Sequence, residues 1–217
     1  MSLHCRPIKL ITMKTIVIAS RKGGTGKTTT TRNLAIALTT LKRKVLLIDT
    51  DSQGSLTLWW KARKHEDINL AVVPYDLLET GLTNAEKAGY DFVLIDTPPE
   101  SNETIISTVK FADFIIVPLK AGADDLRAVG QTLQLIKKVD KPFAFLLNEI
   151  SPNTTITRQA AEAISQYGVL APSQCRRVVH AEASAQGLTC IDLRKSSSAS
   201  REVFALANYI LEKLGEQ

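Results

Sequence analysis

The sequence has few cysteines, few histidines and no long hydrophobic run. Its 217 residues include three cysteines and three histidines. Cys5, Cys175 and Cys190 lie far apart and form no C-x-x-C pair, which argues against a zinc ribbon or a redox dithiol, so we expect buried or incidental thiols. The histidines are scattered as well and show no metal-ligand spacing. No apolar run reaches the roughly 18 residues that a membrane-spanning helix needs.

The composition is that of an ordinary globular chain with a modest basic excess. Hydrophobic residues make up 44%, and 27 Lys and Arg outnumber 22 Asp and Glu, for a net charge of +5. This charge permits binding to a polyanion but does not require it. Residues 1–12 lack the apolar core and cleavage site of a secretory signal, so we expect a cytoplasmic protein. We expect a disordered extension over 1–12, or a natural start at Met13, and a single domain over 13–217.

Short apolar runs alternate along the chain with segments of helical periodicity. The expected strands are 15–19, 45–48, 70–73, 92–95, 114–117 and 143–147, with a last strand at 187–191. The expected helices are 28–41, 56–64, 125–139, 154–166 and 200–214, with helix and loop over 75–88. This alternation predicts an α/β fold, a doubly wound and mostly parallel sheet with helices on both faces.

A glycine-rich turn, R-K-G-G-T-G-K-T-T over residues 21–29, connects the first strand to the first helix. Such a turn directs backbone N–H groups and a helix N-terminus toward a phosphate chain. Lys27 is expected to contact the β- and γ-phosphates, and the Thr28 hydroxyl is expected to bind Mg²⁺. The usual G-x-x-x-x-G-K-[ST] spacing requires Gly at position 21, where this chain has Arg21, and Lys22 is an additional lysine.

Polar residues follow three of the predicted strands where each one ends. Asp49 and Asp51 follow 45–48, Asp96 follows 92–95, and Asn148 follows 143–147. Ligands of such sheets bind at the carboxyl ends of the strands, so these residues and the glycine-rich turn predict one site. Asp96 is expected to hold a water on Mg²⁺, with a turn-capping role as the alternative. Of Asp49 and Asp51, one can serve the metal shell while the other orients an attacking water.

Three segments in combination resemble a known family. They are K-G-G-T-G-K-T-T at 22–29, D-T-D-S-Q-G-S at 49–55 and D-T-P-P at 96–99. They are similar to the deviant Walker A, second motif and Walker B end of the ParA/MinD family of P-loop ATPases. The likeness covers most of 14–214 and is greatest to a small ParA partition ATPase. Ser52 departs from the proline common in that family.

The resemblance implies a Mg²⁺-dependent ATPase with a low basal rate that forms a homodimer when ATP is bound. It assigns Lys22 to the partner's phosphates, Asp51 to the attacking water, Asp49 to the Mg²⁺ shell and Asn148 to adenine. Asp125 is expected at the dimer interface or as a helix N-cap. The implied catalytic residues are Lys22, Lys27 and Asp51. The implied nucleotide contacts are Gly23, Gly24, Thr25, Gly26, Lys27, Thr28, Thr29 and Asn148, and the implied metal ligands are Thr28, Asp49 and Asp96.

The same resemblance leaves the cargo and the surface partner open. Basic residues exceed acidic ones in the last third of the chain: Arg158, Arg176, Arg177, Arg194, Lys195 and Arg201. We therefore expect ATP-dependent, non-specific DNA binding, nucleoid association and a ParB-like or cargo-adaptor partner that stimulates hydrolysis. Plasmid or chromosome partition is the expected function, with positioning of another cargo or MinD-like membrane association as alternatives. The last helix has the apolar stripe of a helix docked on its own sheet, which disfavours membrane binding.

Overall fold

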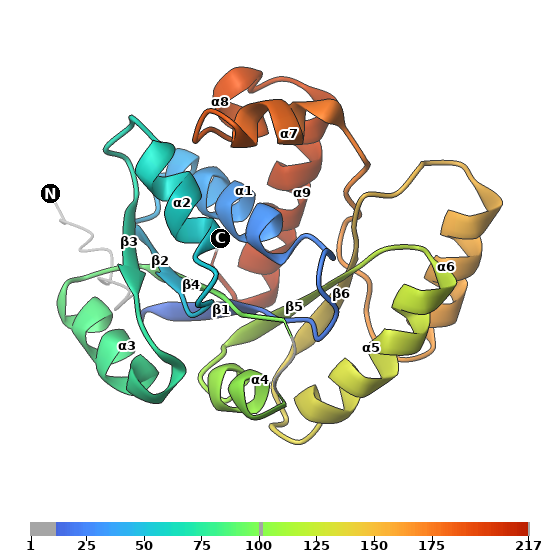
Figure 1. Cartoon of the computed structure of the whole chain (residues 1–217), viewed down its shortest axis with the longest axis horizontal. Helices are drawn as coiled ribbons and strands as arrows, with labels where there is room; N and C mark the ends of the chain where they lie inside the picture. Colours follow the sequence, from blue (N-terminus) through green and yellow to red (C-terminus); the bar gives the residue numbers. More distant parts are fainter. Residues whose placement is uncertain (1–11, 100–101, 217) are drawn as a thin grey trace, which may run out of the picture.

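The structure is a computed structural model that describes residues 12–99 and 102–216, and its centre is a six-stranded parallel sheet (Figure 1). The strands are β1 Lys14–Ile18, β2 Val45–Asp49, β3 Asn69–Val72, β4 Phe92–Asp96, β5 Phe114–Leu119 and β6 Phe143–Leu147. Their order in the sheet is β3-β2-β4-β1-β5-β6, and every pairing is parallel. The inner strands consist largely of Val, Ile, Leu and Phe because helices cover both of their faces.

Helices cover the sheet on both sides. They are α1 Lys27–Thr40, α2 Ser55–Ala62, α3 Leu78–Lys87, α4 Asn102–Val109, α5 Ala123–Ile136, α6 Thr155–Ser165, α7 Val178–Ser184, α8 Cys190–Leu193 and α9 Ser198–Lys213, and a 3-10 turn, Tyr75–Leu77, precedes α3. Residues of α1, α2, α8 and α9 share one apolar core with the sheet, and residues of α3 to α6 share the other (Figure 1). The predicted doubly wound α/β fold is confirmed.

Alternate residues of each inner strand enter opposite cores. In β1, Ile16 and Ile18 pack with α1 and α9, whereas Val17 and the following Ala19 pack with the helices of the other layer. All four side chains are fully buried. This two-residue period is the geometry of a pleated strand, and it fixes which way the residues at each strand end point.

The last helix docks on the protein's own core, as its sequence pattern predicts. Val203, Leu206, Ala207 and Ile210 of α9 are each 0% exposed and belong to the core shared with α1. The apolar stripe is therefore occupied within the fold. Among the described residues, no helix combines the length and the apolar character needed to cross a bilayer.

The strand predicted at 187–191 is wrong. Gly187 has a left-handed φ of 68° and ends the turn that follows α7. Thr189 then caps α8, and its hydroxyl and backbone form a reciprocal capping box with Asp192. Local capping by a Thr and an acidic residue three positions later outweighs the short apolar pattern that suggested a strand. Helices α4 and α7 also lie where the sequence pattern predicts no helix.

Candidate nucleotide-binding site

The glycine-rich turn joins β1 to α1 at the carboxyl edge of the sheet, where the sequence predicts it. Gly24 and Gly26 adopt left-handed φ angles of 72° and 90°. The Thr30 N–H bonds to the Gly26 carbonyl at 2.8 Å, which begins the helical ladder. The amides of Lys27, Thr28 and Thr29 precede this ladder. A helix N-terminus of this kind offers N–H groups and a positive dipole end to an anion.

A side-chain amide from β6 fixes the turn from the other side. Asn148 is 5% exposed, and its Nδ2 donates to the Thr25 carbonyl at 2.9 Å. A Cβ at Gly26 would lie 2.1 Å from that same Nδ2, so glycine is the residue that allows this approach. The described contacts of Asn148 hold the loop. Its contact with adenine stays a prediction.

Lys27 lies inside the cradle formed by the turn. It is 7% exposed, and its Nζ donates to the Lys22 carbonyl at 3.4 Å. Burial lowers the pKa of Lys27, and the charges of Asp96 and Asp51 partly oppose that shift. No carboxylate of the described residues lies within salt-bridge distance of its Nζ, so the cradle holds a cation without a direct counter-ion.

Asp96 faces the cradle from the neighbouring strand. The Thr28 hydroxyl donates to its Oδ2 at 2.6 Å, and the carboxylate is 1% exposed. Burial raises the pKa of Asp96 to about 7; the Thr28 hydrogen bond and Lys27 oppose the rise, whereas Asp49 and Asp51 add to it. A hydroxyl and a carboxylate are the oxygen donors that Mg²⁺ prefers, so Thr28 and Asp96 fit this ion.

Asp49 lies opposite Asp96 in the register of β2 and β4 and is 0% exposed. Its Oδ2 accepts bonds from the Thr57 amide at 2.9 Å and the Thr57 hydroxyl at 2.6 Å, and its Oδ1 accepts from the Asp51 amide at 3.1 Å. These bonds attach α2 and the segment after β2 to the strand end. Asp51 is half-buried beside them, and its Oδ1 accepts from the Gln53 amide. The metal-shell and water-orienting roles of Asp49 and Asp51 stay predictions.

Lys22, the additional lysine, lies at the rim of the cradle. Its Nζ forms an ion pair with Asp125 Oδ2 at 2.7 Å, and the two side chains are 36% and 11% exposed. Asp125 is in the first turn of α5, whose N-cap is Gly122, so the N-cap alternative for Asp125 is wrong. The two lysines therefore occupy different places, with Lys27 buried inside the cradle and Lys22 near the surface.

A hollow of about 640 Å³ continues from the cradle between β6 and α7. Thr29 and Asn148 line it on the cradle side, and His180 and Ser184 line it from α7. A volume of this order suits a small organic ligand such as a nucleoside. The cradle and the hollow together have room for the phosphate chain and the nucleoside of a nucleotide.

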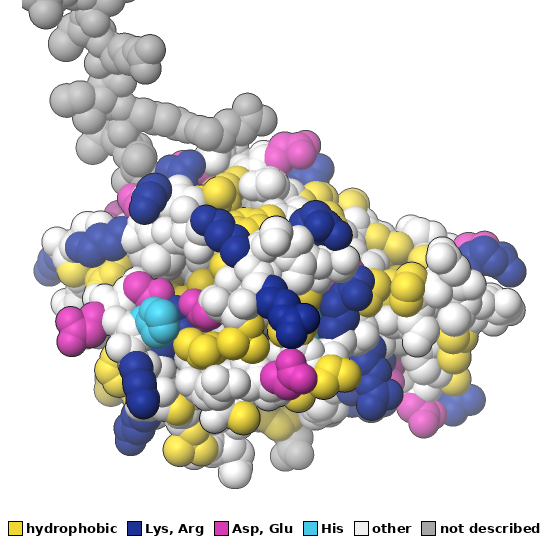
Figure 2. Space-filling model, turned by 90° about the horizontal axis from the view of Figure 1, so that it is seen from above, with side chains coloured by type: hydrophobic (Ala, Val, Ile, Leu, Met, Phe, Trp, Pro, Cys, Tyr) yellow, Lys and Arg dark blue, Asp and Glu magenta, His cyan; other side chains and the backbone are white. Residues whose placement is uncertain are grey.

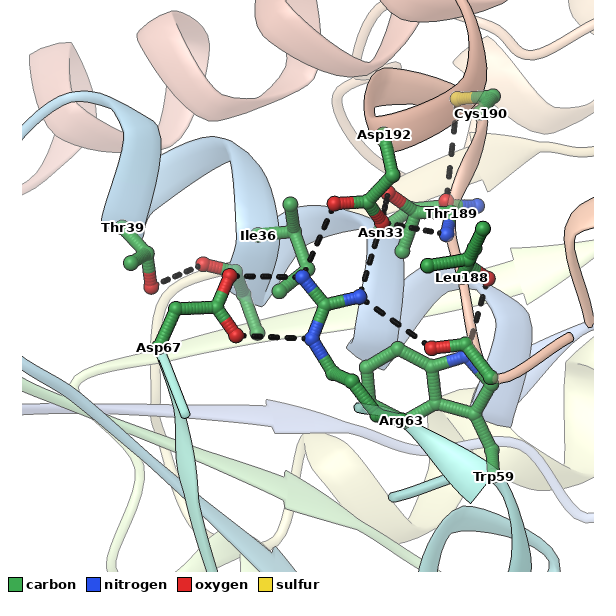
Figure 3. A network of polar contacts seen from close by, with 12 residues as sticks. Asn33, Ile36, Thr39, Trp59, Arg63, Asp67, Leu188, Thr189, Cys190 and Asp192 are labelled. Carbon is green, nitrogen blue, oxygen red and sulfur yellow. Dashed lines mark hydrogen bonds and ion pairs between the residues drawn. The ribbon is translucent and has the colours of Figure 1, made fainter. Parts of the chain in front are cut away.

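Sequence reasoning misses a buried arginine that holds α2 in place. Figure 3 shows the Arg63 guanidinium between the carboxylates of Asp67 and Asp192, with ion pairs of 2.7 and 2.9 Å. Trp59 Nε1 also donates to the Leu188 carbonyl at 3.0 Å. Burial disfavours the charge of Arg63, but the two carboxylates outweigh this effect and raise its pKa. We call Arg63, Asp67 and Asp192 the Arg63 clamp; it joins the end of α2 to α8.

Two further residues that sequence reasoning misses lie on α1, one turn beyond the cradle. The Thr31 hydroxyl lies 3.4 Å from Asp96 Oδ1, and Arg32 reaches the Thr29 hydroxyl at 3.4 Å. Positions 31 and 32 follow Lys27 and Thr28 by four residues. Helical periodicity therefore supplies a usable signal, because residues four apart share one face of a helix.

Comparison with known proteins agrees with this geometry. The CobQ/CobB/MinD/ParA nucleotide binding domain matches residues 16–189. The maintenance of carboxysome distribution protein A of Halothiobacillus neapolitanus is 31% identical over 210 residues, which cover 91% of this chain and 96% of that protein.

Two solved structures share the fold. The septum site-determining protein MinD of Pyrococcus horikoshii, complexed with Mg-ADP, has a TM-score of 0.79 at 22% identity and covers 94% of this chain and 98% of its own. An ATP complex of a Cyanothece McdA variant has a TM-score of 0.79 at 20% identity, with 95% and 98% covered. The chain belongs to the CobQ/CobB/MinD/ParA nucleotide-binding family, as the glycine-rich turn and the strand-end carboxylates predict.

Proposed function

We propose that this protein is a Mg²⁺-dependent ATPase of the ParA/MinD type that forms a homodimer with ATP and positions a cargo on DNA. The cradle and hollow fit the triphosphate and nucleoside of ATP. Thr28 and Asp96 hold Mg²⁺, which supplies charge neutralisation of the phosphates when bound. Asp51 orients the attacking water, and Asp49 supports this arrangement from the strand end.

The observation that carries the dimer proposal is the separation of the two lysines. Lys27 is 7% exposed and is sufficient to occupy the chain's own cradle. The side chain of Lys22 is 36% exposed, at the rim, and is held by Asp125 through an ion pair that faces solvent on one side. A rim lysine is placed to reach an anion that is presented by a second copy. Supplied in this way, it acts as an arginine finger does, a device worth about 10³–10⁵ in rate where measured.

An ATPase assay with a dimerisation measurement tests this proposal. We expect Asp51→Ala to abolish hydrolysis but retain ATP binding, and Lys22→Ala to lose hydrolysis and ATP-dependent dimerisation. Lys120→Ala is the matched control, because Lys120 is a similarly exposed lysine paired with Glu149 at 2.9 Å. Normal dimerisation and hydrolysis by Lys22→Ala would refute a role for this lysine across the dimer.

Cargo positioning is supported by the relative from Halothiobacillus neapolitanus, whose name refers to carboxysome distribution. We therefore favour a cellular cargo with its own adaptor protein over a plasmid with a ParB-like protein. Membrane attachment through α9 is disfavoured because its apolar stripe is packed in the core. Pull-down with ATP-locked protein, followed by identification of the retained adaptor, distinguishes the two cargo classes.

DNA binding is supported by the face that carries α7 and α8. Figure 2 looks onto this face and shows Lys and Arg side chains spread over it, with isolated Asp and Glu side chains between them. Arg176 and Arg194 are exposed and line a hollow of about 350 Å³ at the start of α9. Two other basic residues named from the sequence are engaged with acidic ones, Arg158 with Glu162 at 2.8 Å and Arg177 with Glu202 at 2.5 Å.

Retention on non-specific duplex DNA tests this surface. We expect retention with ATP but not with ADP, and a steep loss as salt rises because counter-ions are released on binding. Arg176→Glu and Arg194→Glu should each weaken retention without changing nucleotide affinity. Arg127→Glu on α5, whose side chain is 80% exposed, is the charge-matched control on the opposite layer. Equal retention with ATP and ADP would contradict a nucleotide-controlled switch.

A further inference from the structure

Arg32 is a buried arginine that the proposed mechanism does not use. It lies on α1 four residues after Thr28 and is 7% exposed. Its Nη1 donates to the Ser184 hydroxyl at 2.6 Å, and its Nη2 donates to the Thr29 hydroxyl at 3.4 Å and the His180 carbonyl at 3.5 Å. Its Nε is buried and has no hydrogen-bond partner among the described residues.

The charge of Arg32 is not neutralised by any nearby carboxylate. Within residues 12–99 and 102–216, no Asp or Glu oxygen lies within 4.0 Å of its guanidinium, and all of its partners are neutral oxygens. Burial lowers the pKa of Arg32 to about 10, and the charge of Asp96 offsets only part of that shift. A buried cation without a counter-ion is costly, and guanidinium is the side chain best suited to phosphate oxygens.

The position of Arg32 specifies which anion would approach it. It contacts Thr29 in the first turn of α1. Thr29 directly precedes Thr30, whose N–H makes the first hydrogen bond of the helix, to the Gly26 carbonyl. Its side chain lines the 640 Å³ hollow and a second hollow of about 450 Å³ beside α2, and Thr29 lines both as well. Arg32 thus lies on the nucleoside side of the cradle, whereas Lys27 lies inside the cradle itself.

We propose that Arg32 binds the phosphate nearest the ribose of a nucleoside di- or triphosphate, and that it is a second buried cation for the phosphate chain. This inference rests on the proposed nucleotide binding. The phosphate supplies the missing counter-charge and an acceptor for the unpaired Nε. Arg32 also contacts Ser184 and His180, so its guanidinium lies against α7. Helix α7 would therefore border the bound phosphate.

Calorimetric titration of ADP and ATP into the Arg32→Met variant tests the proposal. Hydrogen bonds to charged groups are worth enough that we expect affinity for both nucleotides to fall about 10- to 100-fold. The loss should be equal for ADP and ATP because they share this phosphate. Arg32→Lys keeps the charge but not the planar fork, and should bind with intermediate affinity. Arg43→Met, the matched control, removes an arginine that donates to the Glu216 carbonyl at 3.0 Å, away from the cradle, and should retain wild-type affinity.

The melting temperature of the nucleotide-free proteins gives a second readout. Removing a buried, unneutralised charge should leave the Arg32→Met variant at least as stable as the wild type, whereas loss of a purely structural tie to α7 would lower its melting temperature. The proposal is overturned if Arg32→Met binds ADP within twofold of wild type, or if Arg43→Met loses as much affinity as Arg32→Met. Failure of the wild-type protein itself to bind ADP would instead refute the proposed nucleotide function.

Discussion

Two buried arginines, Arg32 and Arg63, have opposite surroundings. Arg63 donates to Asp67 and Asp192 at distances from 2.7 to 2.9 Å, and the residue is 7% exposed. Arg32 is equally buried, but among the described residues its partners are all neutral oxygens and its Nε has none. In this chain, the neutralised buried cation holds two helices together, whereas the buried cation without a counter-ion is free to bind an anionic ligand.

The two lysines of the glycine-rich turn repeat this contrast. Lys27 is buried and, like Arg32, has no carboxylate partner in the part of the chain that the structure describes, whereas Lys22 is paired with Asp125. The pair formed by Lys22 differs from the Arg63 clamp in being partly exposed, so it is weaker and more readily exchanged. Burial and charge pairing together therefore distinguish three kinds of cation in this chain. Lys27 and Arg32 are buried and unpaired, Arg63 is buried and paired, and Lys22 is paired but partly exposed.

The largest expected effect comes from breaking the Arg63 clamp. Arg63→Ala leaves the carboxylates of Asp67 and Asp192 without their shared cation, and removing one partner of a buried ion pair costs about 3–5 kcal/mol. Urea unfolding measures this loss. Arg127→Ala is the matched control, since the side chains of the Arg127–Asp124 pair are 80% and 83% exposed. A loss below about 1 kcal/mol would contradict the structural role of the clamp.

The next effect is a pH dependence due to Asp96. The pKa of Asp96 is raised from 3.8 to about 7 in the fold, so between these values the folded chain binds a proton that the unfolded chain has released. Stability of the nucleotide-free protein should therefore fall as pH rises through this window and level off above it, by about 4 kcal/mol in all.

Asp96→Asn should remove this dependence of stability on pH, because the amide stays neutral at every pH. The variant should match the wild type at pH 4 and exceed its stability at pH 8, while losing its Mg²⁺-dependent nucleotide binding. Urea unfolding at several pH values measures the slope directly. Parallel stability curves for the two proteins would show that Asp96 does not titrate in this range.

A smaller effect is expected at the contact between Gly26 and Asn148. Alanine at position 26 must adopt a left-handed φ of 90° and place its Cβ against Asn148 Nδ2. The left-handed backbone costs about 1–2 kcal/mol, and displacement of the amide disturbs the cradle, so nucleotide affinity should fall more than stability. Asn148→Ala in the same chain removes the collision and should recover part of the stability but not the affinity. No recovery of stability in the double variant would mean that the collision is not the cause.

The smallest effect is expected at the rim. Asp125→Ala removes the partner of Lys22, but partly exposed ion pairs contribute only about 0–1 kcal/mol. The melting temperature should therefore change less than in the variants described above. The Lys22 ammonium loses its ion pair and becomes free at the surface. A loss as large as that of Arg63→Ala would place the Lys22–Asp125 pair with the fixed architecture instead.

Much of the fold and of the cradle could be predicted because the signals are local. The apolar runs, the glycine-rich turn and the strand-end Asp49 and Asp96 are each read within a few neighbouring positions. The Arg63 clamp could not be predicted, since Asp192 lies 129 positions from Arg63 and their pairing depends on where α8 packs. The strand predicted at 187–191 failed for a local reason, because the capping box of Thr189 competes with a short apolar run.

The register of β2 against β4 has a consequence for how the protein folds. Asp49 and Asp96 are 47 positions apart in the chain and become direct neighbours only when these two strands pair in this register. A slip of one residue would place Ile48 or Ile95 at that point and turn the carboxylates to opposite sides. Bringing together strands so distant in sequence is intrinsically slow, so Mg²⁺·nucleotide binding should appear late in refolding. The time at which nucleotide binding appears during refolding would then report when the central sheet is complete.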